Sequence, residues 1–205
     1  ACGEGYYEIL SRMRCGNTII TPDRFIPLIA QFNLSQRFDM QVLETLFSSL
    51  KNHHGRHFSV NLLPYTLMQK DSAAQIIALF KRHNLSAEAI TIEVTEEQAF
   101  SDVETSMHSI AIDDFGTGYA NYERLKSLQA DILKIDGCFV RDIETDPLDA
   151  IMVKSIIEMA KVKKMKVVAE YVETPEQREK LLELGVDYLQ GYLIGKPLPL
   201  SELRT

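Results

Sequence analysis

The regular alternation of strand-like and helix-like segments is what most constrains the fold of this 205-residue chain. Strand-like segments occur at residues 6–10, 58–63, 90–96, 110–112, 131–136, 167–173 and 188–193. Amphipathic helical patterns separate most of them, and one opens at Thr21-Pro22-Asp23, where a capping residue precedes a proline. Strands that alternate with helices form parallel sheets covered by helices. The sequence therefore predicts an α/β fold with seven clear strands.

Several of these strands have one apolar face and one polar face. This feature helps to choose between an open doubly wound sheet and a closed barrel. Asn61, Glu93 and the pair Lys134 and Asp136 supply the polar faces. An open doubly wound sheet could also be built from these segments, but its strands are usually continuous apolar runs. Two-faced parallel strands suit a closed barrel with helices outside and a site at one end. We therefore predict a TIM-type (β/α)8 barrel whose first strand lies at the chain start or upstream of Tyr6.

Composition excludes some functions and leaves others open. The net charge of −7 argues against nonspecific binding to duplex nucleic acid, although a phosphate ligand could still be held through metal ions. The three cysteines show no metal-ligand spacing, which by default indicates a reducing, cytoplasmic compartment. No apolar run approaches the length of a membrane span, and no secretory signal precedes Tyr6. Because the first residue is Ala, we expect a fragment or a processed form of a longer chain.

Chemistry concentrates where the short apolar strand 110–112 ends in Asp113 and Asp114. Gly116 and Gly118 follow and give the next turn access to positive φ. Adjacent acids at the end of an apolar strand are costly unless a cation receives them, although a helix-capping aspartate is the simpler alternative. The other strands favour the cation, because each brings a polar residue toward the same end. These residues are Glu8, Asn61, Glu93, Lys134, Asp136, Glu170 and Gln190.

The carboxyl ends of barrel strands meet at the face that carries the active site. Six acids and one lysine gathered there require compensation, which Mg²⁺ or Mn²⁺ with oxygen ligands would supply. Asp113 beside Asp114 could bridge two ions, as in two-metal hydrolases of phosphoesters.

Two junctions are unusually short. The helical pattern at 98–108 runs into the strand at Ile110 with almost no connector, whereas such connections usually take about two to six residues. We favour residues missing between them over a trimmed connection. A smaller gap of the same kind could lie at residues 15–17.

Five segments together resemble the EAL-domain phosphodiesterases, which hydrolyse cyclic di-GMP. Residues 113–119 match the family sequence DDFGTGY, and residues 131–136 read DILKID. Residues 190–197 read QGYLIGKP, and residues 93–96 are similar to the family's ExTE segment. The naming motif appears at Glu8-Ile9-Leu10, with isoleucine in the middle position. The resemblance covers nearly the whole chain and implies a barrel fold.

The resemblance also implies roles for individual residues. The first metal site would contain Glu8, Asn61, Glu93 and Asp113, and the second Asp113, Asp114 and Glu170. Lys134 would hold the attacking water, and Glu170 is also a candidate base. The implied substrate-binding residues are Leu10, Arg12, Asp136, Glu173 and Gln190. Glu96 would anchor the loop that contains Gly116 and Gly118. Among the departures from the family pattern, Tyr171 replaces a glycine beside Glu170.

As a family member, the chain would use two Mg²⁺ or Mn²⁺ ions to open cyclic di-GMP to the linear dinucleotide pGpG. We expect residues 1–205 to be one domain of a longer multidomain signalling protein, and to form a homodimer. The domain itself would be cytoplasmic and contact no membrane, while upstream domains could anchor the full-length protein to the inner membrane. The alternatives are a receptor of the same fold without turnover and a hydrolase of another phosphoester. Receptors of the family typically lose ligands, and this chain retains all of them.

Overall fold

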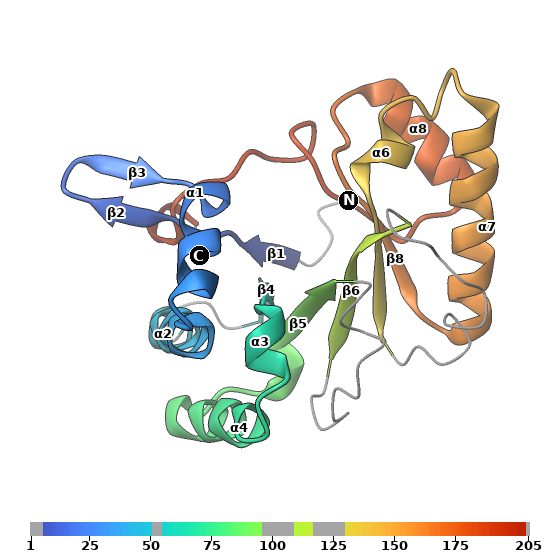
Figure 1. The fold of residues 1–205 in the computed structure, drawn as a ribbon. Helices are drawn as coiled ribbons and strands as arrows, with labels where there is room; N and C mark the ends of the chain where they lie inside the picture. Colours follow the sequence, from blue (N-terminus) through green and yellow to red (C-terminus); the bar gives the residue numbers. More distant parts are fainter. Residues whose placement is uncertain (1–5, 51–54, 96–108, 117–129, 204–205) are drawn as a thin grey trace. The chain divides into compact units, whose positions relative to one another are not determined.

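The computed structural model describes residues 6–50, 55–95, 109–116 and 130–203 (Figure 1). These residues divide into two compact units, one of residues 6–93 and one of residues 94–95 and 109–203, and each is described by itself. The predicted helix at 98–108 lies outside the described residues. The same is true of the short helix that the sequence predicts between the strand ending at Asp113 and the strand at 131–136. Within the described residues, no helix is both long enough and apolar enough to cross a bilayer.

Three parallel strands form the centre of the first unit. They are β1 (Tyr6–Ile9), β4 (His57–Asn61) and β5 (Ile90–Thr95), and β4 pairs with both of the others. The register sets Glu8 beside Ser59 and Asn61 beside Glu93. The predicted alternation of a polar and an apolar face in β5 is only partly expressed, because Thr91 and Glu93 are as deeply buried as Ile92.

Helices connect these strands. They are α1 (Pro22–Gln31), α2 (Ser35–Ser49), the short α3 (Pro64–Leu67) and α4 (Ser72–His83), with a 3₁₀ turn, η2, at Ala87–Ala89. As predicted, α1 begins at Pro22 after Thr21, although the Thr21 side chain makes no capping hydrogen bond. Phe47 of α2 packs on Phe80 of α4 with ring centroids 4.7 Å apart, so apolar side chains join the two helices.

A β-hairpin that the sequence did not predict follows β1. Its strands are β2 (Met13–Cys15) and β3 (Thr18–Ile20), paired antiparallel so that Cys15 lies opposite Thr18. Gly16 has φ +58° and closes the two-residue turn, a conformation that glycine adopts at low cost. Residues 15–17, where a smaller gap could lie, thus form a closed turn in the structure. The three-residue strands on either side are too short to show a hydrophobic period.

Four parallel strands form the second unit in the order β6 (Ile110–Phe115), β7 (Ile132–Ile135), β8 (Lys166–Ala169) and β9 (Tyr188–Leu189). Its helices are α6 (Gly137–Val140), α7 (Pro147–Lys163) and α8 (Pro175–Leu184), followed by the 3₁₀ turn η4 (Leu200–Glu202). The sequence Thr174-Pro175-Glu176 is typical of a helix start, and α8 begins there with a reciprocal capping box between Thr174 and Gln177.

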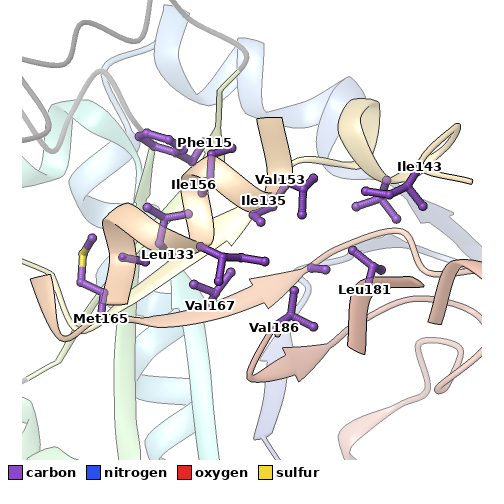
Figure 2. Packing of buried hydrophobic residues seen from close by; sticks show 14 of the residues in the cluster. Phe115, Leu133, Ile135, Ile143, Val153, Ile156, Met165, Val167, Leu181 and Val186 are labelled. Atoms are coloured by element: carbon purple, nitrogen blue, oxygen red, sulfur yellow. The ribbon is translucent and has the colours of Figure 1, made fainter. Parts of the chain in front are cut away.

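The core of the second unit lies between these strands and helices (Figure 2). Leu133 and Ile135 of β7 and Val167 of β8 pack against Ile156 of α7 and Leu181 of α8, all of them buried. Burial of each such side chain stabilises the fold by roughly 1.5–3 kcal/mol. The result is a rigid layer from which the strand ends, with their polar residues, emerge.

The predicted strands were too long at their carboxyl ends. The segment 167–173 is extended only to Ala169, and 188–193 only to Leu189. Tyr171 has φ +55° and Gly191 has φ +152°, so both leave the backbone region that a strand requires. Glu170 and Gln190 are therefore placed by turns that immediately follow the strands.

A buried carboxyl group, Asp39 of α2, fixes the chain just beyond β4. Its Oδ2 accepts a hydrogen bond from the Leu63 N–H at 2.9 Å and another from the Thr66 hydroxyl. Burial raises the pKa of Asp39 to about 6, although both hydrogen bonds act to lower it. The folded protein therefore holds this proton more tightly than the unfolded chain does. Its contribution to stability is complete below the ordinary value of 3.8 and is lost as the pH rises through about 6.

We expect Asp39→Asn to remove this pH dependence. Between pH 4 and pH 7 the unfolding free energy of the parent should fall relative to the variant by about 2.5 kcal/mol, which is most of the effect of roughly two pKa units. Urea unfolding at unit steps of pH measures the difference. Asp23→Asn, which changes an exposed acid on α1, should follow the parent at every pH. Parallel curves for the parent and Asp39→Asn would contradict the assignment.

Candidate functional site

In the first unit, one amide joins two of the predicted acids. The Asn61 Nδ2 atom donates to Glu8 Oε1 and to Glu93 Oε2, each at 3.0 Å. Parallel pairing of β1, β4 and β5 produces this arrangement, because it sets the three residues at neighbouring positions across the sheet. Glu93 is fully buried, and a buried carboxylate requires polar partners. The predicted grouping of Glu8, Asn61 and Glu93 is thus present within this unit.

In the second unit, Asp113, Asp114 and Glu170 form a group of three acids. One carboxylate oxygen from each lies within 4.8 Å of the others. Asp113 and Asp114 belong to β6, while Glu170 directly follows β8. The Glu170 N–H donates to the Ile135 carbonyl at 3.2 Å, which continues the β7–β8 ladder by one residue. Strand pairing therefore brings Glu170 next to Asp113 and Asp114, which precede it in the sequence by 57 and 56 positions.

A buried lysine joins two members of this group. Lys134 Nζ lies 2.8 Å from Asp113 Oδ1 and 2.9 Å from Glu170 Oε1. Its side chain is 0% exposed, and those of Asp113 and Glu170 are 14% and 8% exposed. An ammonium removed from water is tolerated only with charged partners in good geometry. The two carboxylates provide them, so Lys134 does not reach solvent as a lysine at a strand end usually does.

Asp114 sits in a conformation that turns it away from the strand. Its φ of +52° coincides with an irregularity in the β6–β7 register between Ile112 and Phe115. Partial burial, followed by the charges of Asp113 and Asp136, raises the pKa of the Asp114 carboxyl. A cation bound beside these acids would oppose that shift, because it favours their ionised forms.

Gly116 has the positive φ that the sequence predicted, +102°. A Cβ atom there would lie 2.5 Å from the ring of Phe139, so a side chain is excluded by space as well as by backbone conformation. The corresponding prediction for Gly118 lies outside the described residues, and so does the anchoring role predicted for Glu96.

Asp136 ends β7 and caps α6. Its Oδ1 accepts the Cys138 N–H at 2.8 Å. Burial alone would raise the pKa of Asp136, but hydrogen bonds from Cys138 and from the Gly137 N–H lower it, so the group stays ionised at neutral pH. Burial and this neighbouring acid raise the pKa of the Cys138 thiol to about 11, which leaves Cys138 unsuited to act as a nucleophile.

Gln190 is fixed through its backbone to the segment that carries Glu170. The Gln190 N–H donates to the Ala169 carbonyl at 2.8 Å, and the Gln190 carbonyl accepts the Val172 N–H at 2.9 Å. Gln190 therefore lies next to the Glu170 turn, as the predicted convergence of strand ends requires.

The remaining predicted substrate-binding residues lie near strand or helix ends. Leu10 directly follows β1 and is exposed, and Arg12 is exposed with Nη1 2.9 Å from the Ser11 carbonyl. Glu173 is exposed, and its N–H donates to Gln177 Oε1 at the start of α8. None of these contacts tests the substrate roles, which stay predictions.

Gly191 has no role in the sequence-based prediction, yet the structure leaves no room for a side chain there. A Cβ atom there would lie 2.3 Å from both the N and the O of Val172. The signal was visible in the sequence as a glycine inside the predicted strand 188–193, a position that often marks close backbone approach.

We expect Gly191→Ala to destabilise the fold by about 3 kcal/mol, since backbone must move and φ +152° suits only glycine. Gly195→Ala is the matched control, because a Cβ at that position meets nothing within 4 Å. Thermal unfolding of both variants measures the difference. Equal melting temperatures would show that the Val172 contact does not constrain residue 191.

The donors of both units suit a hard divalent cation. All the charged ligand candidates are carboxylates, and the amide of Asn61 adds a further oxygen. In the second unit, three acids surround one ammonium, so negative charge remains in excess. Mg²⁺ and similar ions prefer such oxygen ligands. The acidic groups could therefore hold metal ions.

Comparisons with known proteins agree with this geometry. Residues 3–197 match the family model described as "EAL domain". The chain is 59% identical to the probable cyclic di-GMP phosphodiesterase PdeA of Escherichia coli and 44% identical to the cyclic di-GMP phosphodiesterase PdeF of the same organism. Both alignments cover 98% of the chain but 29% of the relative, so the chain spans less than a third of these proteins.

Solved structures show the same fold. The structure described as "PaMucR Phosphodiesterase, c-di-GMP complex" matches 96% of this chain and 86% of that chain, with a TM-score of 0.87 and 32% identity. The EAL domain of Xanthomonas citri FimX, described as a complex with c-diGMP, matches 97% and 84% with a TM-score of 0.87. At 18% identity that likeness concerns the fold alone. The predicted (β/α)8-barrel type of fold is confirmed, and the chain belongs to the EAL domain family.

Proposed function

We propose that this chain is the catalytic domain of a metal-dependent phosphodiesterase that opens cyclic di-GMP to pGpG. The observation that carries the proposal is the buried Lys134, held between Asp113 and Glu170 in a group that includes Asp114. The printed names of the relatives, cyclic di-GMP phosphodiesterases, support the substrate. The family match from residue 3 to residue 197 supports a single domain that includes both units.

We assign the metal ligands to two sets and the metal to Mg²⁺ or Mn²⁺. Glu8, Asn61 and Glu93, which meet through the Asn61 amide, are ligands of the first set. Asp113, Asp114 and Glu170 are ligands of the second, with Asp113 as the bridging residue that the family resemblance implies. Two bound ions would activate water and stabilise the charge that develops on the leaving oxygen.

The residues of the second unit provide the acid–base chemistry. Glu170 would accept a proton from the water that attacks phosphorus. The Lys134 ammonium orients that water and offsets the negative charge that gathers on the phosphate oxygens. The phosphorus–O3′ bond breaks as the new bond to the water oxygen forms, and O3′ takes up a proton. The product carries one 5′-phosphate and one free 3′-hydroxyl.

Substrate contacts are assigned to residues at the strand ends. Arg12 would pair with a phosphate of the dinucleotide, and Leu10, Asp136, Glu173 and Gln190 would border the bound molecule. We assign to Glu96, Gly116 and Gly118 the role of presenting Asp113 and Asp114. A cytoplasmic location and a homodimer complete the proposal, and the substrate itself is the partner that the relatives' names support most directly.

Chromatography of cyclic di-GMP incubated with the protein and Mg²⁺ or Mn²⁺ tests the proposal. The expected result is metal-dependent appearance of the linear dinucleotide. A protein that binds cyclic di-GMP but does not open it with either metal would instead be a receptor of this fold. Turnover of other phosphodiesters but not of cyclic di-GMP would change the substrate.

A further inference from the structure

Tyr171 is an unusual residue beside the reactive group. It directly follows Glu170, and its φ of +55° belongs to the left-handed region that a bulky residue rarely occupies. Its neighbours are fixed on both sides. Glu170 bonds to the Ile135 carbonyl and to Lys134, and Val172 bonds to Gln190 and Leu193. The turn at residue 171 is thus imposed by its surroundings, and strained residues of this kind cluster at functional sites.

The side chain of Tyr171 rests on a glycine that leaves room for it. A Cβ atom at Gly137 would lie 2.5 Å from Tyr171 Cδ2, 2.6 Å from Cγ and 2.8 Å from Cβ. Gly137 is buried and directly follows Asp136. The ring therefore packs against the backbone beside Asp136 while its own residue adjoins Glu170. Despite this packing the residue is 64% exposed.

We infer that Tyr171 is a binding residue whose exposed ring stacks on a guanine base of the substrate. The inference rests on the proposed function and adds the contact that holds a base. A ring that packs on the Gly137 backbone and belongs to a largely exposed residue can accept a planar partner with little loss of side-chain entropy. Stacking of one base on an aromatic side chain raises affinity by roughly 5- to 150-fold, from about 1–3 kcal/mol per base.

Removal of the ring should weaken binding and leave the chemical step almost intact. Tyr171→Gly suits φ +55° and is therefore expected to fold. We expect its KM and its calorimetric dissociation constant for cyclic di-GMP to rise about tenfold while kcat changes less than twofold. Tyr171→Phe keeps the ring and should behave as the parent. A fall in kcat with unchanged binding would overturn the inference.

The Gly137 contact supplies an independent test. Gly137→Ala should displace the ring and weaken binding in the parent, but should have little further effect when Tyr171 is already glycine. Equal effects of Gly137→Ala on the dissociation constant in both backgrounds would show that the contact does not position a binding ring.

Fluorescence observes the stacking directly, because the chain contains no tryptophan. Tyr171→Trp places one indole at the proposed contact, and Tyr188→Trp places one at the opposite, amino end of β9, on a residue that is 45% exposed. Cyclic di-GMP, added in the presence of Ca²⁺, should quench the indole fluorescence of Tyr171→Trp and leave that of Tyr188→Trp unchanged. Equal quenching, or none in either, would contradict the inference. Because this readout needs no turnover, it separates failure of the stacking contact from failure of the proposed hydrolysis.

Discussion

Replacement of Lys134 by methionine is expected to slow the opening of cyclic di-GMP at least a hundredfold. Methionine keeps much of the stem's bulk but leaves Asp113 and Glu170 without their shared ammonium. A loss of about two orders of magnitude corresponds to roughly 3 kcal/mol of transition-state stabilisation. Calorimetric binding of the dinucleotide should persist, because the role proposed for Lys134 concerns the attacking water and the developing charge and not the bound substrate.

The thermal stability of Lys134→Met should also show the effect of the lost positive charge. Removing one partner from a buried ion pair costs about 3–5 kcal/mol, so Lys134→Met should melt at a lower temperature without metal. Added Mg²⁺ should raise that melting temperature more than it raises the parent's, because the cation replaces the lost charge. Lys166→Met, which removes a lysine from an exposed pair with Asp187, serves as the control for rate and stability. A Lys134→Met protein with the parental rate would refute the catalytic role.

Asp113→Asn is expected to lower hydrolysis by about a thousandfold or more, roughly 4 kcal/mol. The substitution preserves the shape of the Asp113 side chain but removes its negative charge. That charge pairs with Lys134 and contributes to the candidate metal site with Asp114 and Glu170. Metal ligation should suffer first, so the increase in melting temperature on addition of Mn²⁺ should shrink. Binding of cyclic di-GMP should weaken less, since the contacts proposed for the bases and phosphates involve other residues.

Asp142→Asn, at an exposed position between α6 and α7, should retain full activity and the full metal-dependent stabilisation. Together the two variants separate a general effect of lost charge from the specific role of Asp113. Substantial turnover by Asp113→Asn at saturating metal would remove this residue from the bridging position.

The short parallel strands and the acids at their ends were predictable because each leaves a local signal. A buried strand such as β7 is an apolar run, and Pro22 marks the start of α1 by its fixed φ and its absent N–H. Grouping of Glu8, Asn61 and Glu93 followed from topology, since the carboxyl ends of parallel strands share one edge.

Where each strand ends was not predictable, because conformation there depends on distant partners. Tyr171 looks like a strand residue by its own propensity. The carbonyls of Ile135 and Gln190 nevertheless hold the adjoining peptides on either side of its left-handed conformation. Gly191 reads as a weak position in a strand, and only the approach of Val172 makes it irreplaceable. The β2–β3 hairpin was missed because strands of three residues carry no period.

The sequence by itself determined the parallel α/β architecture, the family and the set of acids that could hold metal, because periodicity and motif are properties of neighbouring residues. Only the tertiary structure decided that Lys134 is buried between Asp113 and Glu170, and that Tyr171 rests on Gly137. These pairs join residues on different strands and turns. Their contacts arise from register, packing and the exclusion of water, which no single segment encodes.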